Sequence, residues 1–170
     1  TRCGINGNDH ALGNSAFFRC KMNYNGKVGE YCLANTSFYE CEFIGNSEVG
    51  AQNSWQNIFY ECLFCNNTWA GANQWATSWF INCVIDNNLD GIEFSSTSTT
   101  FIGNVVNCRI TNHSQSGRLG IDKSGTATRV LLHNIYFGGN ELAYTVPVSG
   151  ICDIVSFNGN YTNVIASGVD

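Results

Sequence analysis

The chain is 170 residues long, carries a formal net charge of −5 and has charged side chains at only 12% of its positions. This length suits one domain with a substantial core. The negative charge excludes a non-specific electrostatic grip on nucleic acid, and no apolar run is long enough to insert into a membrane. Aromatic and aliphatic residues are too plentiful for a disordered chain, and so few charges do not suit a bundle of amphipathic helices.

An internal repeat organises the chain. Four cysteines follow one another at intervals of 21 residues: Cys20, Cys41, Cys62 and Cys83. Two further anchors, Cys108 and Asn134, follow after 25 and 26 residues, which leaves room for loops. A fixed period of this length predicts a solenoid, in which each repeat forms one unit that stacks on the next.

Each repeat begins with a short strand around its anchor. Apolar residues stand two positions before and two positions after the anchor, and a polar residue stands immediately before it. This is the period-two pattern of a strand with one buried face, so we predict that positions −2, 0 and +2 point inward. The residues two before the anchor are Phe18, Tyr39, Tyr60, Ile81, Val106 and Leu132, and those two after it are Met22, Phe43, Phe64, Ile85, Ile110 and Tyr136.

An asparagine corner and a glycine-led strand complete each repeat. Asparagine tolerates the left-handed region and its amide can bond a neighbouring turn, so a column of asparagines predicts a ladder of stacked corners. A glycine then allows a tight bend into another short strand. The corner column is Asn25, Asn46, Asn67 and Asn88 with His113 in the fifth place, and the glycine column is Gly4, Gly29, Gly50, Gly71, Gly91, Gly120 and Gly150.

These units predict a right-handed parallel β-helix of about seven coils, with residues 1–170 as a single domain. A repeat of short strands can bury its apolar face only by stacking on copies of itself. A left-handed hexapeptide helix would repeat every ~18 residues with small aliphatics, and a leucine-rich repeat would need a leucine ladder that is missing here. Both ends of the stack look open, so we expect a fragment of a longer chain, or ends closed by another subunit.

The nine cysteines, an odd number, are expected to stay reduced. Five form one inward column, where each thiol packs on the next like a small hydrophobic group. We expect Cys62 and Cys65 on opposite sides of a corner, so that they form no metal or redox pair. Buried thiols favour folding in a reducing cytoplasm. We expect neither a metal nor a cofactor.

The runs FYECEFIGN, FYECLFCNN and WFINCVIDNN, with LDGIEF and LLHNIYFGGN, resemble coils of the pectate-lyase-like superfamily of right-handed β-helices. They are most similar to the tailspike and tail-fibre proteins of bacteriophages, over essentially the whole chain. The resemblance implies a module that recognises a bacterial surface polysaccharide and can cleave it. It also implies a virion-tail protein that folds in the host cytoplasm and acts outside the cell. The known motifs of polygalacturonases and pectate lyases are missing.

Glu93 and Asp122 are the candidate catalytic residues. They occupy equivalent outward positions of successive glycine-led strands, whose backbones should lie about 5 Å apart. Two carboxyl groups about 5 to 5.5 Å apart fit a retaining glycosidase, and wider pairs fit an inverting one. One carboxyl would have its pKa raised by the other and serve as the acid, while the second acts as nucleophile or base. The alternative is a solvated polar stripe.

Uncharged polar residues lead up to this pair on the same face. Tyr31, Gln52 and Asn73 are the candidate substrate-binding residues, because a sugar-binding face is polar and uncharged. Trp55 and Trp75 stand in neighbouring segments, where exposed indole rings would stack on pyranose rings. For all four tryptophans of the chain, core or corner packing is the alternative.

Two other surfaces have simpler explanations. Glu40 and Glu61 should stack beneath Arg19, where their like charges need compensation, so an ion pair with Arg19 is favoured over an active site. Bound Ca²⁺ would also compensate them, but no Asp-rich ligand loop supports it. The column after the anchor mixes charged residues with apolar ones such as Leu63 and Val84, which suggests a covered surface. The cover in a tailspike would be the other subunits of a homotrimer, but a long loop would serve as well.

Two functions are therefore open. The first is a tailspike-like module that binds a bacterial surface polysaccharide, with or without hydrolysing it. The second is a non-catalytic structural or adhesive β-helix domain, in a bacterial cell-surface passenger or as a spacer in a virion fibre. A groove with exposed Trp or Tyr around Glu93 and Asp122 would favour the enzyme, and a flat wall or salt bridges would favour the spacer.

Overall fold

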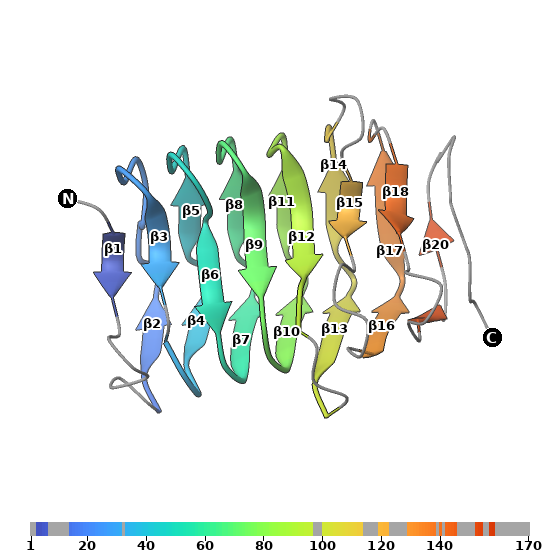
Figure 1. Cartoon of the computed structure of the whole chain (residues 1–170), viewed down its shortest axis with the longest axis horizontal. Helices are drawn as coiled ribbons and strands as arrows, with labels where there is room; N and C mark the ends of the chain where they lie inside the picture. Colours follow the sequence, from blue (N-terminus) through green and yellow to red (C-terminus); the bar gives the residue numbers. More distant parts are fainter. Residues whose placement is uncertain are drawn as a thin grey trace.

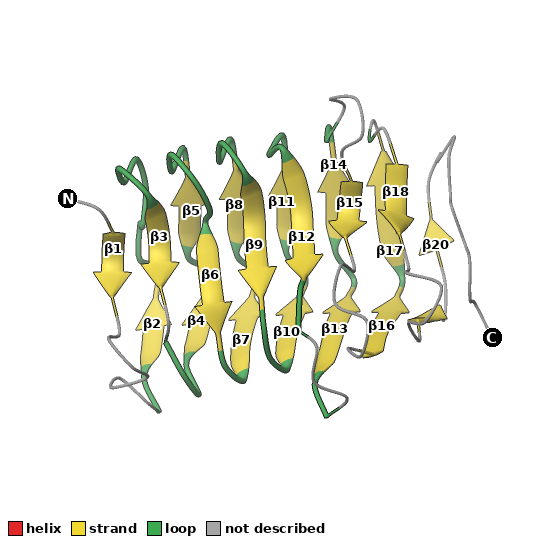
Figure 2. Cartoon of the chain, in the orientation of Figure 1, coloured by secondary structure: helices red, strands yellow, loops and turns green. Residues whose placement is uncertain are grey.

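The computed structural model of the chain describes residues 3–6, 14–31, 33–96, 100–113, 119–122, 129–138, 140, 142–145, 152–154 and 157–158. Among these residues all regular structure is β-strand (Figure 2), and no helix there is long and apolar enough to cross a membrane. The strands form three parallel sheets that run along an elongated molecule (Figure 1). Gly150 lies outside the described residues.

The three sheets take their strands from each repeat in turn. Sheet A contains β1 (Cys3–Asn6), β3 (Val28–Tyr31), β6 (Ala51–Ser54), β9 (Ala70–Gln74), β12 (Asp90–Phe94), β15 (Leu119–Asp122) and β18 (Leu142–Thr145). Sheet B contains β2 (Ala16–Phe18), β4 (Ser37–Tyr39), β7 (Asn57–Tyr60), β10 (Ser78–Ile81), β13 (Ile102–Val106), β16 (Arg129–His133) and β19 (Cys152–Ile154). Sheet C contains β5 (Glu42–Ile44), β8 (Leu63–Cys65), β11 (Val84–Asp86), β14 (Arg109–Thr111), β17 (Ile135–Gly138) and β20 (Phe157–Asn158).

One turn of the chain passes through sheets A, B and C and returns to sheet A one rung further along, so the predicted parallel β-solenoid is confirmed. In Figure 1 the strands of sheet A run downward in front, those behind run upward, and the chain advances from left to right, which makes the coil right-handed. About four turns follow one another regularly. The expected count of seven coils matches the depth of sheets A and B but exceeds the number of regular turns.

The corner between sheets B and C reverses the predicted orientation of one column. The residue before each anchor has a left-handed backbone, with φ of 53° at Arg19 and 54° at Glu40. This bend interrupts the alternation of side chains along the strand. Position −3 therefore points inward and position −2 points outward, and the prediction for position −2 was wrong. Phe38 is fully buried, whereas Phe18 is 65% exposed.

The sixth anchor is Ile135 rather than Asn134. Asn134 has the left-handed φ of the corner residues, 53°, and Ile135 is fully buried. Tyr136 consequently points outward, where it pairs with Arg109, and Phe137 takes the buried place two residues after the anchor. The repeat from Cys108 to Ile135 is therefore one residue longer than the alignment of anchors assumed.

Stacked phenylalanine rings fill the interior. Phe38 and Phe59 of sheet B stack with centroids 5.1 Å apart, and Phe43 and Phe64 of sheet C stack at 4.7 Å. The two stacks meet edge to face, as between Phe38 and Phe43 at 5.5 Å and 74°. Both geometries are favourable for aromatic rings, so each coil places its rings over those of its neighbour.

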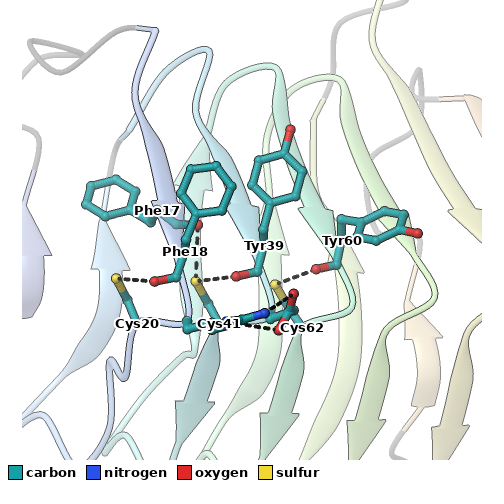
Figure 3. A network of polar contacts seen from close by, with 9 residues as sticks. Phe17, Phe18, Cys20, Tyr39, Cys41, Tyr60 and Cys62 are labelled. Carbon is teal, nitrogen blue, oxygen red and sulfur yellow. Dashed lines mark hydrogen bonds and ion pairs between the residues drawn. The ribbon is translucent and has the colours of Figure 1, made fainter.

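The predicted inward column of reduced thiols is confirmed for the described cysteines. Its members, none of which forms a disulfide, are Cys20, Cys41, Cys62, Cys83 and Cys108. Each thiol donates to the carbonyl two residues earlier, over 3.3 to 3.5 Å, as Figure 3 shows for the first three. Burial raises the pKa of the Cys83 thiol, which keeps it protonated.

Cys62 and Cys65 were predicted to lie on opposite sides of a corner, and this prediction was wrong. Cys62 immediately precedes β8 and Cys65 ends it, so the two residues share one extended segment. Cys62 is buried and Cys65 is half-buried on the outer side, in register with Ile44 and Asp86. Both are free thiols.

The asparagine ladder is confirmed at the corner between sheets C and A. Asn67 Nδ2 donates to Asn88 Oδ1 and to the carbonyl of Phe43, each over 2.9 Å. Asn46 Nδ2 donates to Asn67 Oδ1 in the same way, again over 2.9 Å. His113 continues the column, with Nδ1 2.9 Å from the carbonyl oxygen of Asn88. Every one of these side chains is buried.

The glycine column packs directly beneath this ladder. A Cβ atom on Gly71 would lie 2.7 Å from the carbonyl oxygen of Gly91 and 3.1 Å from Asn88 Nδ2. No side chain fits there without movement of the backbone in the next coil. The glycine and asparagine columns therefore recur together: the asparagine side chain occupies the space that a Cβ atom would need.

Candidate functional site

The outer face of sheet A carries the predicted site residues in a single column. Register pairs run from Tyr31 to Gln52, from Gln52 to Asn73, from Asn73 to Glu93 and from Glu93 to Asp122. Adjacent members are thus direct neighbours in successive strands, about 4.8 Å apart along the axis. The structure brings together all five residues in the order that the repeat predicts.

Hydrogen bonds orient the first carboxyl group of this column. Asn73 Nδ2 donates to Glu93 Oε2 over 2.6 Å, and Ser95 Oγ donates to Asn73 Oδ1 over 3.1 Å. Asn73 is only 4% exposed, while Glu93 and Asp122 are half-buried. An amide donor stabilises an ionised carboxylate. This hydrogen bond holds the Glu93 carboxyl group in place beside Asn73.

Two tryptophans flank the column at the corner where sheet A leads into sheet B. Trp55 directly follows β6 and Trp75 directly follows β9, so they belong to successive coils. Trp55 is 42% exposed and Trp75 is 50% exposed, which rules out core packing for both. The ring of Trp55 meets that of Phe101 edge to face at 5.5 Å. Trp75 stands two residues beyond Asn73, about 7 Å along an extended chain.

Of the second acidic pair, Glu40 and Glu61, Glu40 forms the ion pair with Arg19 that the sequence predicted. Arg19 Nε lies 2.7 Å from Glu40 Oε2, on an exposed corner. The hydrogen bond from Arg19 lowers the pKa of Glu40, and the same bond raises that of Arg19. Two further ion pairs join the same two coils, from Lys21 to Glu42 over 3.3 Å and from Lys27 to Glu48 over 3.1 Å. These charges link neighbouring coils.

A hollow on the opposite edge of sheet A was not predicted. It has a volume of about 310 Å³ and lies outside the corner between sheets C and A. Its lining is Asn66, Asn67, Asn87, Asn88 and Asn112 with Thr68 and Leu89. We call it the asparagine hollow. Glu93, Asp122, Trp55 and Trp75 take no part in it, so the predicted carboxyl pair lies on a sheet face and not in this depression.

Sequence reasoning missed the hollow because it used only the inner member of each asparagine doublet. Asn66, Asn87 and Asn112 each precede a member of the buried ladder, and their left-handed φ values of 55°, 49° and 63° turn them outward. The recurrence of a second asparagine at the one-coil spacing is the signal that would have found them.

The outer face of sheet B is aromatic, which the sequence interpretation also missed. The rings of Phe18 and Tyr39 stack with centroids 4.8 Å apart and planes 9° apart, and Tyr60 follows at 6.2 Å (Figure 3). Because Phe18 and Tyr39 stack face to face, the faces they turn toward each other are occupied. Sugar binding by stacking needs a free ring face. This column is therefore a weaker sugar platform than Trp55 and Trp75.

Among the described residues, no group of three or more His, Cys, Asp or Glu side chains is placed to hold a metal ion. No protein-family model matches the chain, and searches of curated proteins and of solved structures each gave no match. The fold is thus a parallel β-solenoid on structural grounds.

Proposed function

We propose that this solenoid binds a bacterial surface polysaccharide along the outer face of sheet A, as a tailspike-like receptor-binding module. The observation that carries the proposal is the continuous polar column from Tyr31 to Asp122, flanked by Trp55 and Trp75. Phenol, amide and carboxyl groups in register offer donors and acceptors at a regular interval. Exposed indole rings beside them offer the apolar surface that pyranose rings cover.

Hydrolysis by Glu93 and Asp122 is a second proposal for the same face. The hydrogen bond from Asn73 to Glu93 supports it, because it holds one of the two carboxyl groups in a fixed position. The water that would attack, and the glycosidic oxygen that would be protonated, must both reach a pair on an open sheet face. The position of the pair outside the asparagine hollow makes binding the better supported of the two activities.

A non-catalytic role in an assembly is the rival proposal. It is supported by the outer face of sheet B, where neighbouring strands carry an uncharged cluster rich in aromatic residues: Tyr39, Ile58, Tyr60, Trp79 and Ile81. Faces depleted of charge and rich in aromatic residues are typical of subunit interfaces. A homotrimer in a virion tail, or a spacer on a bacterial surface, would use this face.

Binding to purified capsular polysaccharides and O-antigens tests the proposal. We expect the chain to bind at least one of them, and Trp75→Ala to weaken binding about tenfold, the effect of losing one stacking contact. Phe18→Ala is the matched control, because Phe18 is an exposed aromatic residue on the outer face of sheet B, away from the column. If no bacterial glycan binds, or if both variants weaken binding equally, the sheet A face is not the site.

Release of reducing ends from the bound glycan tests hydrolysis. Glu93→Gln and Asp122→Asn should each abolish it while binding persists, and Glu61→Gln, an exposed carboxyl at another corner, should leave it intact. Binding without any release by the unaltered chain would leave the module as a receptor-binding or adhesive domain.

A further inference from the structure

The asparagine hollow has the size and repetition of a ligand site. Its volume of about 310 Å³ lies near the lower end for small-ligand pockets, about 300 Å³. Asn66, Asn87 and Asn112 are all exposed and occupy equivalent places of three successive coils. Their amides therefore recur about every 4.8 Å along the solenoid axis. A site that repeats in this way fits a ligand that also repeats.

Hydrogen bonds hold these outer amides in place before any ligand arrives. Asn87 Nδ2 donates to Asn66 Oδ1 over 2.6 Å, and Asn112 Nδ2 donates to Asp86 Oδ1 over 2.7 Å. Thr111 Oγ1 donates to the same oxygen of Asp86 over 2.6 Å. The left-handed backbone turns each of these side chains outward. A site ordered in advance loses less conformational entropy on binding.

The hollow carries no charge of its own. Its lining consists of amides, one hydroxyl and one aliphatic side chain. The nearby carboxylates are already engaged: Asp86 accepts the two hydrogen bonds above, and Glu48 forms an ion pair with Lys27 over 3.1 Å. Among the described residues no Lys or Arg lines the hollow, so an uncharged polar ligand is favoured over an anion.

An apolar edge borders the amides. Leu89 lines the hollow. Trp69 occupies the equivalent place one coil earlier, because the residue after Leu89, Asp90, donates its backbone N–H to the carbonyl of Trp69. Trp69 N in turn donates to the carbonyl of Glu48. Trp69 is 41% exposed. Amide groups that both donate and accept, beside an aromatic surface, match the hydroxyl groups and the C–H face of a pyranose ring.

We propose that the asparagine hollow is a second binding site of this chain, specific for uncharged hexopyranose units of an oligosaccharide or polysaccharide. Outer amides of successive coils bind hydroxyl groups of successive sugars, and Trp69 and Leu89 support a ring. This site is separate from the sheet A face, and the proposal does not depend on whether that face binds a glycan.

Titration calorimetry of the full chain with neutral hexasaccharides tests this site. The probes are cellohexaose, maltohexaose, mannohexaose and chitohexaose. We expect one of them to bind, with about tenfold weaker affinity for Asn87→Gly and for Trp69→Ala, as expected for one lost polar or stacking contact. Glycine keeps the left-handed backbone, so Asn87→Gly should remain folded.

Asn82→Gly is the matched control. Asn82 belongs to the same coil, is also exposed and has a left-handed φ of 55°, but it lies at the corner between sheets B and C. Its replacement should leave affinity unchanged. Equal binding by Asn87→Gly and Asn82→Gly would overturn the inference, as would binding that only Trp75→Ala removes. If acidic glycans bind and none of the four neutral ones does, the inference fails while the proposed function stands.

Discussion

Asn66 and Asn67 are adjacent in the chain, yet they belong to two different regions of the same corner. Asn67 is 2% exposed, and its amide is hydrogen bonded to the coils on both sides. Asn66 is exposed, and its side chain borders the asparagine hollow. Asparagine thus has two roles at this corner. An amide saturated inside the solenoid holds coils together, whereas an amide turned outward retains capacity for a ligand.

Removing an inner amide should have the largest effect. Asn67→Ala leaves Asn46 Nδ2 and the carbonyl of Phe43 without this partner in a buried place, so we expect a loss of about 3 kcal/mol in the free energy of unfolding. Urea denaturation followed by circular dichroism measures it. A loss below about 1 kcal/mol would show that the ladder is not a main source of stability.

The glycine beneath the ladder should come next. In Gly71→Ala the new methyl group would lie 2.7 Å from the carbonyl oxygen of Gly91, so one coil must move relative to the next. We expect a loss of about 2 kcal/mol, typical of overpacking against a neighbour that cannot yield. The same denaturation experiment measures it, and an unchanged midpoint would mean that the corner is more pliable than its spacing indicates.

The histidine in the ladder makes the inner region sensitive to pH. Burial lowers the pKa of His113, against the opposing influence of Asp86 and Asp90. The folded pKa is below the unfolded value of about 6.5, so stability is fully present above about pH 6.5 and falls as the pH drops toward the folded pKa. The slope should not exceed about 1.4 kcal/mol per pH unit for one proton.

Unfolding measured between pH 7.5 and pH 5 tests this effect. In His113→Asn the ladder regains its usual residue, and the component of the pH dependence that His113 contributes should disappear. An identical pH profile in both proteins would show that His113 does not titrate in this window.

The outer region should be the most tolerant. Asn66→Gly should change the free energy of unfolding by less than about 0.5 kcal/mol, because glycine adopts the left-handed backbone readily. Asn66→Ala should cost about 1 kcal/mol, since alanine does not. Thermal melts of the two variants, side by side, separate the backbone effect from the loss of the amide. A large loss in Asn66→Gly would mean that the outer amides also hold the fold.

The columns of the solenoid could be predicted because every coil repeats the same contacts. Cys62 and Asn67 are placed by their neighbours one period away, and that period is visible in the sequence. The outward direction of position −2 could not be predicted in the same way. Arg19 and Glu40 are not typical left-handed residues, so the corner is not visible in the first coils. Asn82 and Asn107 in the same column are typical ones, and they are the signal that could have marked it.

The sheet A column could likewise be placed from its register, but its chemical detail could not. The bond from Asn73 to Glu93 and the exposure of Trp75 depend on side-chain rotamers and on neighbouring coils. The asparagine hollow depends on the shape that three coils make together, and a search along one strand at a time does not detect it.

The asparagine ladder also gives the molecule a direction. From Asn25 to Asn67, each Nδ2 donates to the Oδ1 of the following coil, so these amide dipoles point the same way along the axis. Aligned hydrogen bonds polarise one another and grow stronger as the row lengthens. A duplicated coil would extend this polarisation, whereas a coil of reversed sense would confront donor with donor and end it.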